Sequence, residues 1–179
     1  AAQIAATYIM ESGKDWSYPY YRDGAYVLGL GLSSREQLLS FLARADDPCS
    51  GGRQMPMHYS KKDLRIVSQS SATGTQYLQA VGCGLSRKLE KNKEIVYVSS
   101  GEGTTSQGDF HEALNWSSRE KAPVIFHIQD NEYAISTHKS EQTAGSVFSL
   151  VSGYENLSRF QVDGTDFFET HLAFKQAAE

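Results

Sequence analysis

Residues 94–133 read EIVYVSSGEGTTSQGDFHEALNWSSREKAPVIFHIQDNEY, and this stretch decides the fold. It holds two short runs rich in β-branched and aromatic residues, at 94–99 and 123–128, which is typical of strands. Between them, residues 105–120 have the pattern of a helix. A strand, a helix and a second strand in such close succession predict a right-handed crossover between parallel strands. The sequence therefore predicts an α/β fold with a parallel sheet flanked by helices.

The rest of the chain adds further helices around this unit. Apolar spacing predicts helices at 2–12 and 73–91, a last helix from about residue 166, and a further strand at 159–162. Ser34 and Gln37 have the spacing of a capping box that opens another helix. Residues 15–32 are expected to form an ordered loop with a short helix near its end, and 46–72 show no clear period. Gly82 and Gly84 inside a helix indicate close packing against another element.

Length and composition favour one globular domain over residues 1–179. The chain has 40% hydrophobic and 21% charged residues and a net charge of −4, which disfavours a general nucleic-acid binder. No apolar run approaches the roughly 20 residues that cross a bilayer. Two cysteines are too few for a disulfide framework and favour a reducing compartment. Both ends fall inside helix-like stretches, so we expect a piece of a longer polypeptide.

Two polar clusters follow the predicted strands, at residues 100–105 and 129–133. Ligands of parallel α/β sheets bind beyond the carboxyl ends of the strands. If the two strands are neighbours, Glu102 and Asn131 can converge on one cation. Carboxylate and amide oxygens suit Mg²⁺ or Ca²⁺, and Mg²⁺ usually keeps positions for substrate phosphates. With the flanking glycines and the N–H groups of the following helix, the pattern indicates a Mg²⁺-bridged diphosphate.

The run GEGTTSQGDFHEALNWSSREKAPVIFHIQDNEYAIST, residues 101–137, resembles the thiamine diphosphate motif in the α subunit of 2-oxo acid dehydrogenases, in their decarboxylating E1 component. The likeness extends to YYRDGAY at 20–26, GRQMPMHY at 52–59, SSATGTQYLQAVG at 70–82 and FQVDGTDFF at 160–168. GRQMPMHY and YAIST resemble the branched-chain type more than the pyruvate type. The resemblance implies a thiamine diphosphate-binding fold, with this domain as the part that anchors the diphosphate.

The resemblance also implies a set of site residues. Glu102 and Asn131 would ligate Mg²⁺ by their side chains, and Tyr133 by its backbone carbonyl. The residues implied to hold the cofactor are Tyr21, Arg22, Ser71, Gly103, Thr104 and Gln129. Those matching a structural K⁺ site in some relatives are Ser70, Ala72, Thr75 and Gln76.

The chain departs from the family pattern at several of these positions. Glu102 replaces the commoner Asp, Ala72 stands where Pro is frequent, and Gln129 stands where relatives have Arg or Glu. If Gln129 replaces an Arg, one diphosphate contact loses its charge. The family's C-terminal histidine loop would lie beyond Glu179.

The implied activity is oxidative decarboxylation of a branched 2-oxo acid and transfer of the acyl group to a lipoyl-bearing E2 acyltransferase. The family's proton-transfer glutamate belongs to the β subunit or a fused β half, so no catalytic residue is assigned to this chain. An α₂β₂ assembly, or a homodimer of a fused chain, would follow. The implied compartment is the bacterial cytoplasm or the mitochondrial matrix, and neither nucleic acid nor membrane is expected as a partner.

Other readings stay open at the level of sequence. The chain could belong to a pyruvate, acetoin or transketolase-like enzyme of the same fold, or be a non-catalytic module that keeps the fold. A Rossmann-type nucleotide binder is disfavoured, because no full G-x-G-x-x-G follows a strand. Among single residues, Arg22 could be a solvated surface charge, and His58 could line a substrate channel or be an ordinary hydrogen-bonded loop histidine.

Overall fold

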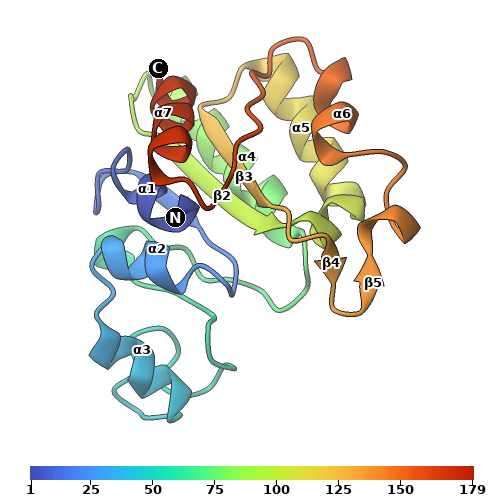
Figure 1. Cartoon of the computed structure of the whole chain (residues 1–179). Coiled ribbons are helices and arrows are strands. Elements are labelled where there is room, and N and C mark those ends of the chain that lie inside the picture. The colour runs from blue at the N-terminus through green and yellow to red at the C-terminus, as the bar shows by residue number, and fades with distance from the viewer.

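The computed structural model describes residues 1–179 and centres on a three-stranded parallel sheet (Figure 1). The strands, in sheet order, are β1 (Trp16–Tyr18), β2 (Val96–Gly101) and β3 (Val124–Gln129). A separate hairpin pairs β4 (Tyr133–Ala134) with β5 (Thr137–His138). The helices are α1 (Ala2–Thr7), α2 (Gly24–Gly29), α3 (Ser34–Phe41), α4 (Thr75–Leu89), α5 (Gly108–Glu120), α6 (Val147–Leu150) and α7 (Phe167–Ala178). Short 3₁₀ helices cover Lys62–Leu64, Glu102–Ser106, Lys139–Glu141 and Val151–Gly153.

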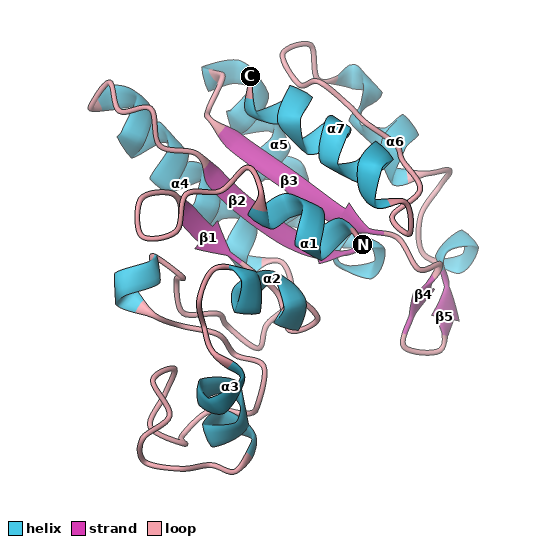
Figure 2. Cartoon of the chain, turned by 60° about the vertical axis from the view of Figure 1, so that its left-hand side comes forward, coloured by secondary structure: helices cyan, strands magenta, loops and turns pink.

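Helices cover both faces of the sheet, which confirms the predicted α/β class (Figure 2). The alternation of side chains along β2 explains the two layers. Val96 and Val98 pack with α4 and α5 in one buried cluster. Tyr97, between them, points to the other face and stacks on Tyr26 of α2, with ring centroids 4.2 Å apart. Helices α1 and α7 also pack into the buried cluster on that face.

Helix α4 packs closely on the sheet through one of its two internal glycines. A Cβ atom on Gly84 would lie 2.7 Å from Val124 Cγ2, so only glycine fits there. A Cβ on Gly82 would meet nothing within 4 Å. The prediction of close packing is therefore confirmed for Gly84 and wrong for Gly82.

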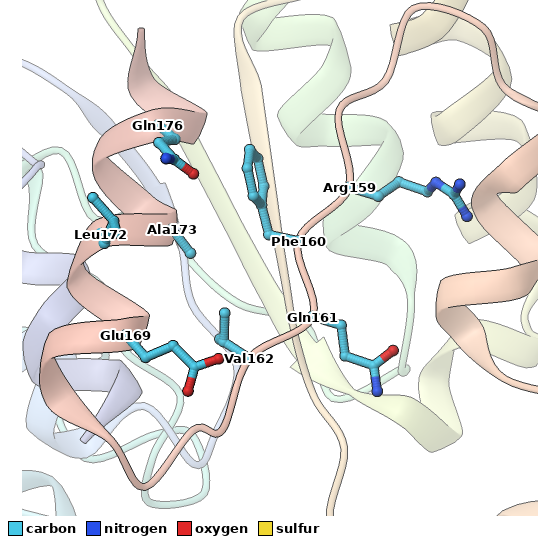
Figure 3. Close-up of a pocket in the computed structure, with 8 residues that line it drawn as sticks. All are labelled: Arg159, Phe160, Gln161, Val162, Glu169, Leu172, Ala173 and Gln176. Atoms are coloured by element: carbon cyan, nitrogen blue, oxygen red, sulfur yellow. The ribbon is translucent and has the colours of Figure 1, made fainter.

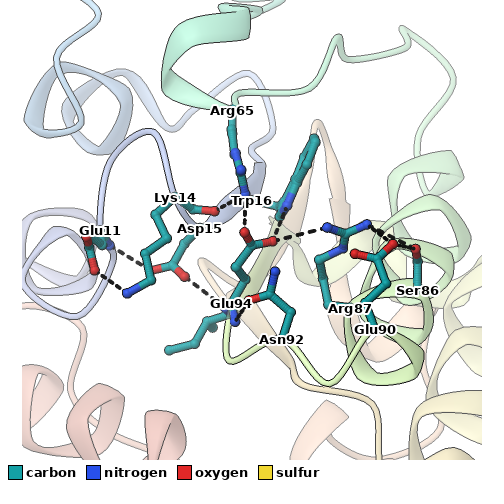
Figure 4. Close-up of polar contacts among 11 residues, drawn as sticks. Glu11, Lys14, Asp15, Trp16, Arg65, Ser86, Arg87, Glu90, Asn92 and Glu94 are labelled. Atoms are coloured by element: carbon teal, nitrogen blue, oxygen red, sulfur yellow. Dashed lines mark hydrogen bonds and ion pairs between the residues drawn. The ribbon is translucent and has the colours of Figure 1, made fainter.

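A buried polar network links the strands at the amino-terminal end of the sheet (Figure 4). The Glu94 carboxylate pairs with Arg65 at 2.6 Å and with Arg87 at 3.5 Å, and it accepts a hydrogen bond from Trp16 Nε1 at 3.0 Å. Asp15 accepts a bond from the Ile95 N–H at 2.8 Å. This network joins β1, β2 and α4 at the end of the sheet opposite to the predicted site, so we assign it a structural role.

Several sequence predictions are wrong in detail. Residues 159–162 pair with no strand. In 15–32 the short helix near the end is confirmed as α2, but strand β1 was missed. The capping box is formed by Ser33 and Glu36, one residue before the predicted pair, because the sequence SSREQ offers the same spacing in both registers. The helix predicted at 2–12 ends at Thr7. No helix of the chain combines the length and apolar character needed to cross a membrane.

The helices around the site also begin later than predicted. The helix predicted from residue 105 is split into the 3₁₀ helix Glu102–Ser106 and α5, which starts at Gly108. The helix predicted from residue 73 starts at Thr75. Both shifts place the start of the helix beside the carboxyl ends of the strands, where the polar clusters lie.

Candidate active site at the carboxyl ends of β2 and β3

The two predicted polar clusters meet in space. Strands β2 and β3 are hydrogen-bonded neighbours, and Gly101 lies opposite Gln129 at their carboxyl ends. Glu102 comes directly after Gly101 and Asn131 two residues after Gln129, and the Asn131 N–H donates a hydrogen bond to Glu102 Oε2 at 3.2 Å. Two residues 29 positions apart are thus brought together by the pairing of the strands, as the sequence argument predicted.

Glu102 carries an unpaired buried oxygen. Its side chain is 4% exposed, and Oε1 has no hydrogen-bond partner. The Tyr20 hydroxyl is likewise buried without a partner, and its pKa, which burial raises, is raised further by the charge of Glu102. A buried polar atom without a protein partner is costly and indicates that a water or an ion can bind there. A carboxylate oxygen in this state fits a hard cation.

Asn131 and Tyr133 form a tight turn beside this carboxylate. The Tyr133 N–H donates to Asn131 Oδ1 at 3.0 Å, which leaves a second lone pair on that oxygen. Glu132, between them, has a positive φ of 73°, so the backbone turns sharply into β4. The amide oxygen is thus oriented by a bond within the turn.

The glycine of the G-E-G motif that follows Glu102 is required by packing. A Cβ atom on Gly103 would lie 2.5 Å from Ala134 Cβ in β4. The Gly103 carbonyl accepts a hydrogen bond from Gln142, a residue that sequence reasoning missed. This close approach holds the β4–β5 hairpin over the 3₁₀ helix and therefore fixes Asn131 relative to Glu102.

Tyr21 and Arg22 lie on the neighbouring loop between β1 and α2. Arg22 Nη2 donates to the Tyr21 hydroxyl at 3.1 Å, and this bond raises the pKa of the guanidinium, with a smaller contribution from Glu102. The loop is tied to α1, because Gln3 Nε2 donates to the Arg22 carbonyl at 2.9 Å. Arg22, the one cationic side chain of this loop, is therefore held near Tyr21 by a side-chain bond and by its backbone carbonyl.

A cavity of about 310 Å³ opens beside these residues. It is lined by Tyr20, Tyr21, residues 55–58, residues 69–73, Gln76 and Thr104. Its wall includes the predicted Ser71, whose Oγ lies 2.7 Å from His58 Nε2. His58 Nδ1 lies 3.1 Å from the Met55 carbonyl, so this histidine is oriented from both sides. Ser70, Ala72 and Thr104 share the wall with them.

The four residues matched to a K⁺ site lie together at the start of α4. The Ala72 N–H donates to Ser70 Oγ at 3.1 Å, and Thr75 Oγ1 donates to the Ala72 carbonyl at 3.1 Å. Gln76 Oε1 accepts from the Gly74 N–H at 3.1 Å, and its Nε2 donates to the Ser99 carbonyl at 3.1 Å. The Gln76 amide is therefore engaged at both ends and joins α4 to β2.

Gln129 is also engaged within the protein. Its Nε2 donates to Asp23 Oδ1 at 2.7 Å, and its Oε1 accepts from Gln3 at 3.2 Å. Asp23 is completely buried, which raises the pKa of its carboxyl to about 6. Sequence reasoning missed Asp23, Gln3 and Tyr20. For Asp23, its position directly after the Tyr-Arg pair was an available signal.

A second groove of about 300 Å³ is formed by residues near the end of the chain (Figure 3). It runs between the extended segment 159–162 and α7, and Phe160 and Val162 face this helix across it. Arg159 points the other way, toward α6, and donates to the Phe148 carbonyl at 2.7 Å. None of the predicted site residues lines this groove.

Comparison with known proteins bears on all of these residues. A family model described as "Dehydrogenase E1 component" matches residues 1–179. The chain is 41% identical to the 2-oxoisovalerate dehydrogenase subunit alpha of Bacillus subtilis (strain 168), over all of this chain and 54% of that protein. It is 37% identical to the mitochondrial 2-oxoisovalerate dehydrogenase subunit alpha of Caenorhabditis elegans, over 92% of this chain and 38% of that protein.

A pyruvate dehydrogenase E1 component subunit alpha, from Staphylococcus aureus (strain Mu50 / ATCC 700699), is 33% identical over all of this chain and 45% of its own length. The chain thus spans about half the length of the curated relatives it matches. The resemblance stated from the motifs is confirmed, and the two branched-chain relatives are more similar to this chain than the pyruvate one.

Proposed function

Because the chain belongs to the dehydrogenase E1 component family, which has a thiamine diphosphate-dependent α/β fold, we propose that it is the cofactor-anchoring α region of a branched-chain 2-oxo acid dehydrogenase. The observation that carries the proposal is the buried Glu102 carboxylate, whose unpaired oxygen lies beside Asn131 where β2 and β3 end. A structural glutamate would have both oxygens paired, as Glu94 has at the other end of β2.

Glu102, Asn131 and the Tyr133 carbonyl would hold Mg²⁺. All three supply hard oxygen atoms, which suit this ion, and Mg²⁺ usually leaves part of its shell to substrate phosphates. The Glu102 charge lowers the energy of a cation in a position that water reaches poorly. Asn131 contributes no charge but fixes the second ligand direction through its bond to the Tyr133 N–H.

The diphosphate would lie between this cation and the loop that carries Tyr21 and Arg22. A guanidinium suits phosphate oxygens because it presents several donors in one plane. The backbone N–H groups of Gly103 and Thr104 open the 3₁₀ helix and would donate to the same anion. Ser71 and Gln129 would complete the cofactor contacts, and K⁺ at Ser70, Ala72, Thr75 and Gln76 would fix the start of α4.

Thiamine diphosphate, when bound, supplies the electron sink for loss of CO₂ from a 2-oxo acid. The residues of this chain bind and orient the anionic end of the cofactor, and none is placed to move a proton in the reaction. A β-type subunit or fused β half would supply that group, and a lipoyl-bearing E2 acyltransferase would accept the acyl product. The names of the relatives support a bacterial cytoplasmic or mitochondrial enzyme.

A branched 2-oxo acid is the proposed substrate. The greater identity to the two 2-oxoisovalerate dehydrogenase subunits supports it over pyruvate. The cavity beside the site is walled by Tyr20, Tyr21 and Met57, which gives it an apolar side that a branched alkyl group can contact.

Titration of the full-length protein, assembled with its β-type partner, tests the proposal. Calorimetry should detect thiamine diphosphate binding with MgCl₂ and none with EDTA. Absence of binding, or binding that does not need the metal, would refute the assignment. A panel of 3-methyl-2-oxobutanoate, pyruvate and acetoin then identifies the substrate by the fastest turnover, and binding without turnover of any of them indicates a non-catalytic module.

A further inference from the structure

Asp23 is the most deeply buried carboxylate near the candidate site. Its exposed fraction is 0%, and it follows Arg22 directly in the loop between β1 and α2. It starts α2, but its side chain makes no capping bond to that helix. The usual structural reason for an aspartate at this position therefore does not apply.

The bonds of Asp23 point to the sheet instead. Oδ2 accepts a hydrogen bond from the Ser99 hydroxyl on β2 and one from the Tyr20 N–H at 3.4 Å. Oδ1 accepts from Gln129 Nε2 at the end of β3, at 2.7 Å. One carboxylate thus joins the loop that carries Arg22 to the ends of both strands that carry Glu102 and Asn131.

Gln3 extends this connection to α1. Its Nε2 donates to Gln129 Oε1 at 3.2 Å and to the Arg22 carbonyl at 2.9 Å, and its Oε1 accepts from the Ala25 N–H at 3.2 Å. Arg22 is therefore fixed at its backbone by Gln3 on one side and by Asp23 on the other. Gln3 and Asp23 do not bond the guanidinium group itself, which can therefore contact a ligand at the site.

The charge of Asp23 is expensive in this place. Burial raises the pKa of the carboxyl to about 6, although bonds from Ser99 and Gln129 oppose the shift. The titratable or charged groups that interact with it are Arg22 and Tyr20 of its own loop, Tyr26 of α2, Tyr97 of β2 and Tyr59. Arg22 is the only cation among them.

We infer that Asp23 is a positioning residue for cofactor binding, which holds Arg22 and Gln129 at the diphosphate side of the site without touching the ligand itself. The inference rests on the proposed function, because it concerns the same cofactor. Partners that orient ligating groups in this way are typically worth about 10- to 100-fold in affinity.

Asp23→Asn tests this inference in the full-length protein assembled with its β-type partner. Asparagine keeps the shape but cannot accept all three bonds. Asp15→Asn is the matched control, because Asp15 is also a buried aspartate (5% exposed) that accepts backbone bonds, from Glu11 and Ile95, at the opposite edge of the sheet. Calorimetry with thiamine diphosphate and MgCl₂ gives Kd, and thermal unfolding without cofactor gives stability.

We expect Asp23→Asn to raise Kd about tenfold or more; its thermal stability is measured alongside, because the amide cannot accept all three bonds. Asp15→Asn should lower stability and leave Kd unchanged. In the Arg22→Ala background, Asp23→Asn should add much less to Kd than in the wild type, because it acts through that residue. Ser99→Ala, which removes one hydroxyl donor, should raise Kd in the same direction and serves if Asp23→Asn fails to assemble.

Three results would overturn the inference: an unchanged Kd in Asp23→Asn, an equal rise in Kd in the Arg22→Ala background, or an equal rise in Asp15→Asn. Each of these presupposes that the wild type binds the cofactor. Failure of the wild type to bind refutes the proposed function instead, so the two failures are distinguishable.

Discussion

Exchanging Glu102 for glutamine removes one negative charge from the proposed cation site and keeps the shape of the side chain. In the ligand-free protein, Oε2 accepts one bond from the Asn131 N–H and Oε1 has no partner. Glutamine can still accept the Asn131 bond, and it removes a buried charge that has no ion-pair partner at salt-bridge distance. The free energy of unfolding without ligand should therefore change by no more than about 1 kcal/mol.

Cofactor binding should respond far more strongly. Removing one partner of a buried charge pair costs roughly 3–5 kcal/mol. Since each 1.4 kcal/mol is about a factor of ten in Kd, the Mg²⁺-dependent affinity for thiamine diphosphate should fall at least about 100-fold. The large loss of affinity beside a small change in stability is the signature of a group that faces a ligand.

Isothermal titration calorimetry and thermal unfolding measure the two quantities on the same preparation. Glu94→Gln is the control, because Glu94 is buried to a similar degree but is paired with Arg65 and Arg87. It should lose stability and keep the wild-type Kd. If Glu102→Gln binds as the wild type does, or loses stability as Glu94→Gln does, the carboxylate is structural and the cation site is refuted.

Three further changes test packing and charge. Gly103→Ala should weaken cofactor binding and lower the free energy of unfolding by about 1–3 kcal/mol, because its Cβ would clash with Ala134. Adding Ala134→Gly in the same chain should restore part of the binding and part of the stability in the same assays. Gly82→Ala should raise the free energy of unfolding by about 1 kcal/mol, whereas Gly84→Ala should lower it. Denaturation curves that shift in the same direction for both variants would contradict the packing argument. The carboxyl of Asp23 has a pKa of about 6 in the folded protein, against an ordinary value of 3.8. The folded state therefore binds this proton more tightly than the unfolded state. The stability that this group contributes is lost as pH rises from about 4 through 6. Thermal unfolding across that range should show this loss in the wild type relative to Asp23→Asn, and parallel profiles would refute it.

The sheet was predictable where the sequence carries a periodic signal. Strands β2 and β3 are runs of β-branched and aromatic residues, and successive side chains point alternately to the two covered faces of the sheet. Strand β1 has three residues, and its extended form depends on pairing with β2, which no local pattern encodes. The reverse error occurred at 159–162, where a β-prone sequence is extended but has no strand beside it.

The candidate site was predictable where its residues come just after strands. Glu102 and Asn131 were found because strand pairing alone brings them together. Tyr20 and Asp23 were missed, since their role depends on burial and on contacts with Ser99 and Gln129 that lie more than 75 residues away. The motif drew attention to Tyr21 and Arg22 but gave no indication that the next residue is buried and bonded to both strands.

The two buried carboxylates at this edge of the sheet differ in one respect that separates ligand from support. Asp23 has both oxygens hydrogen-bonded by the protein and is 0% exposed, so its carboxylate faces protein groups. Glu102 has one oxygen bonded and one free, and the free oxygen lies in the same neighbourhood as the unpaired Tyr20 hydroxyl. A protein that buries an unpaired carboxylate oxygen loses stability unless a ligand compensates it. Under the proposed function, Glu102 would therefore hold the cation and Asp23 would support the residues around it.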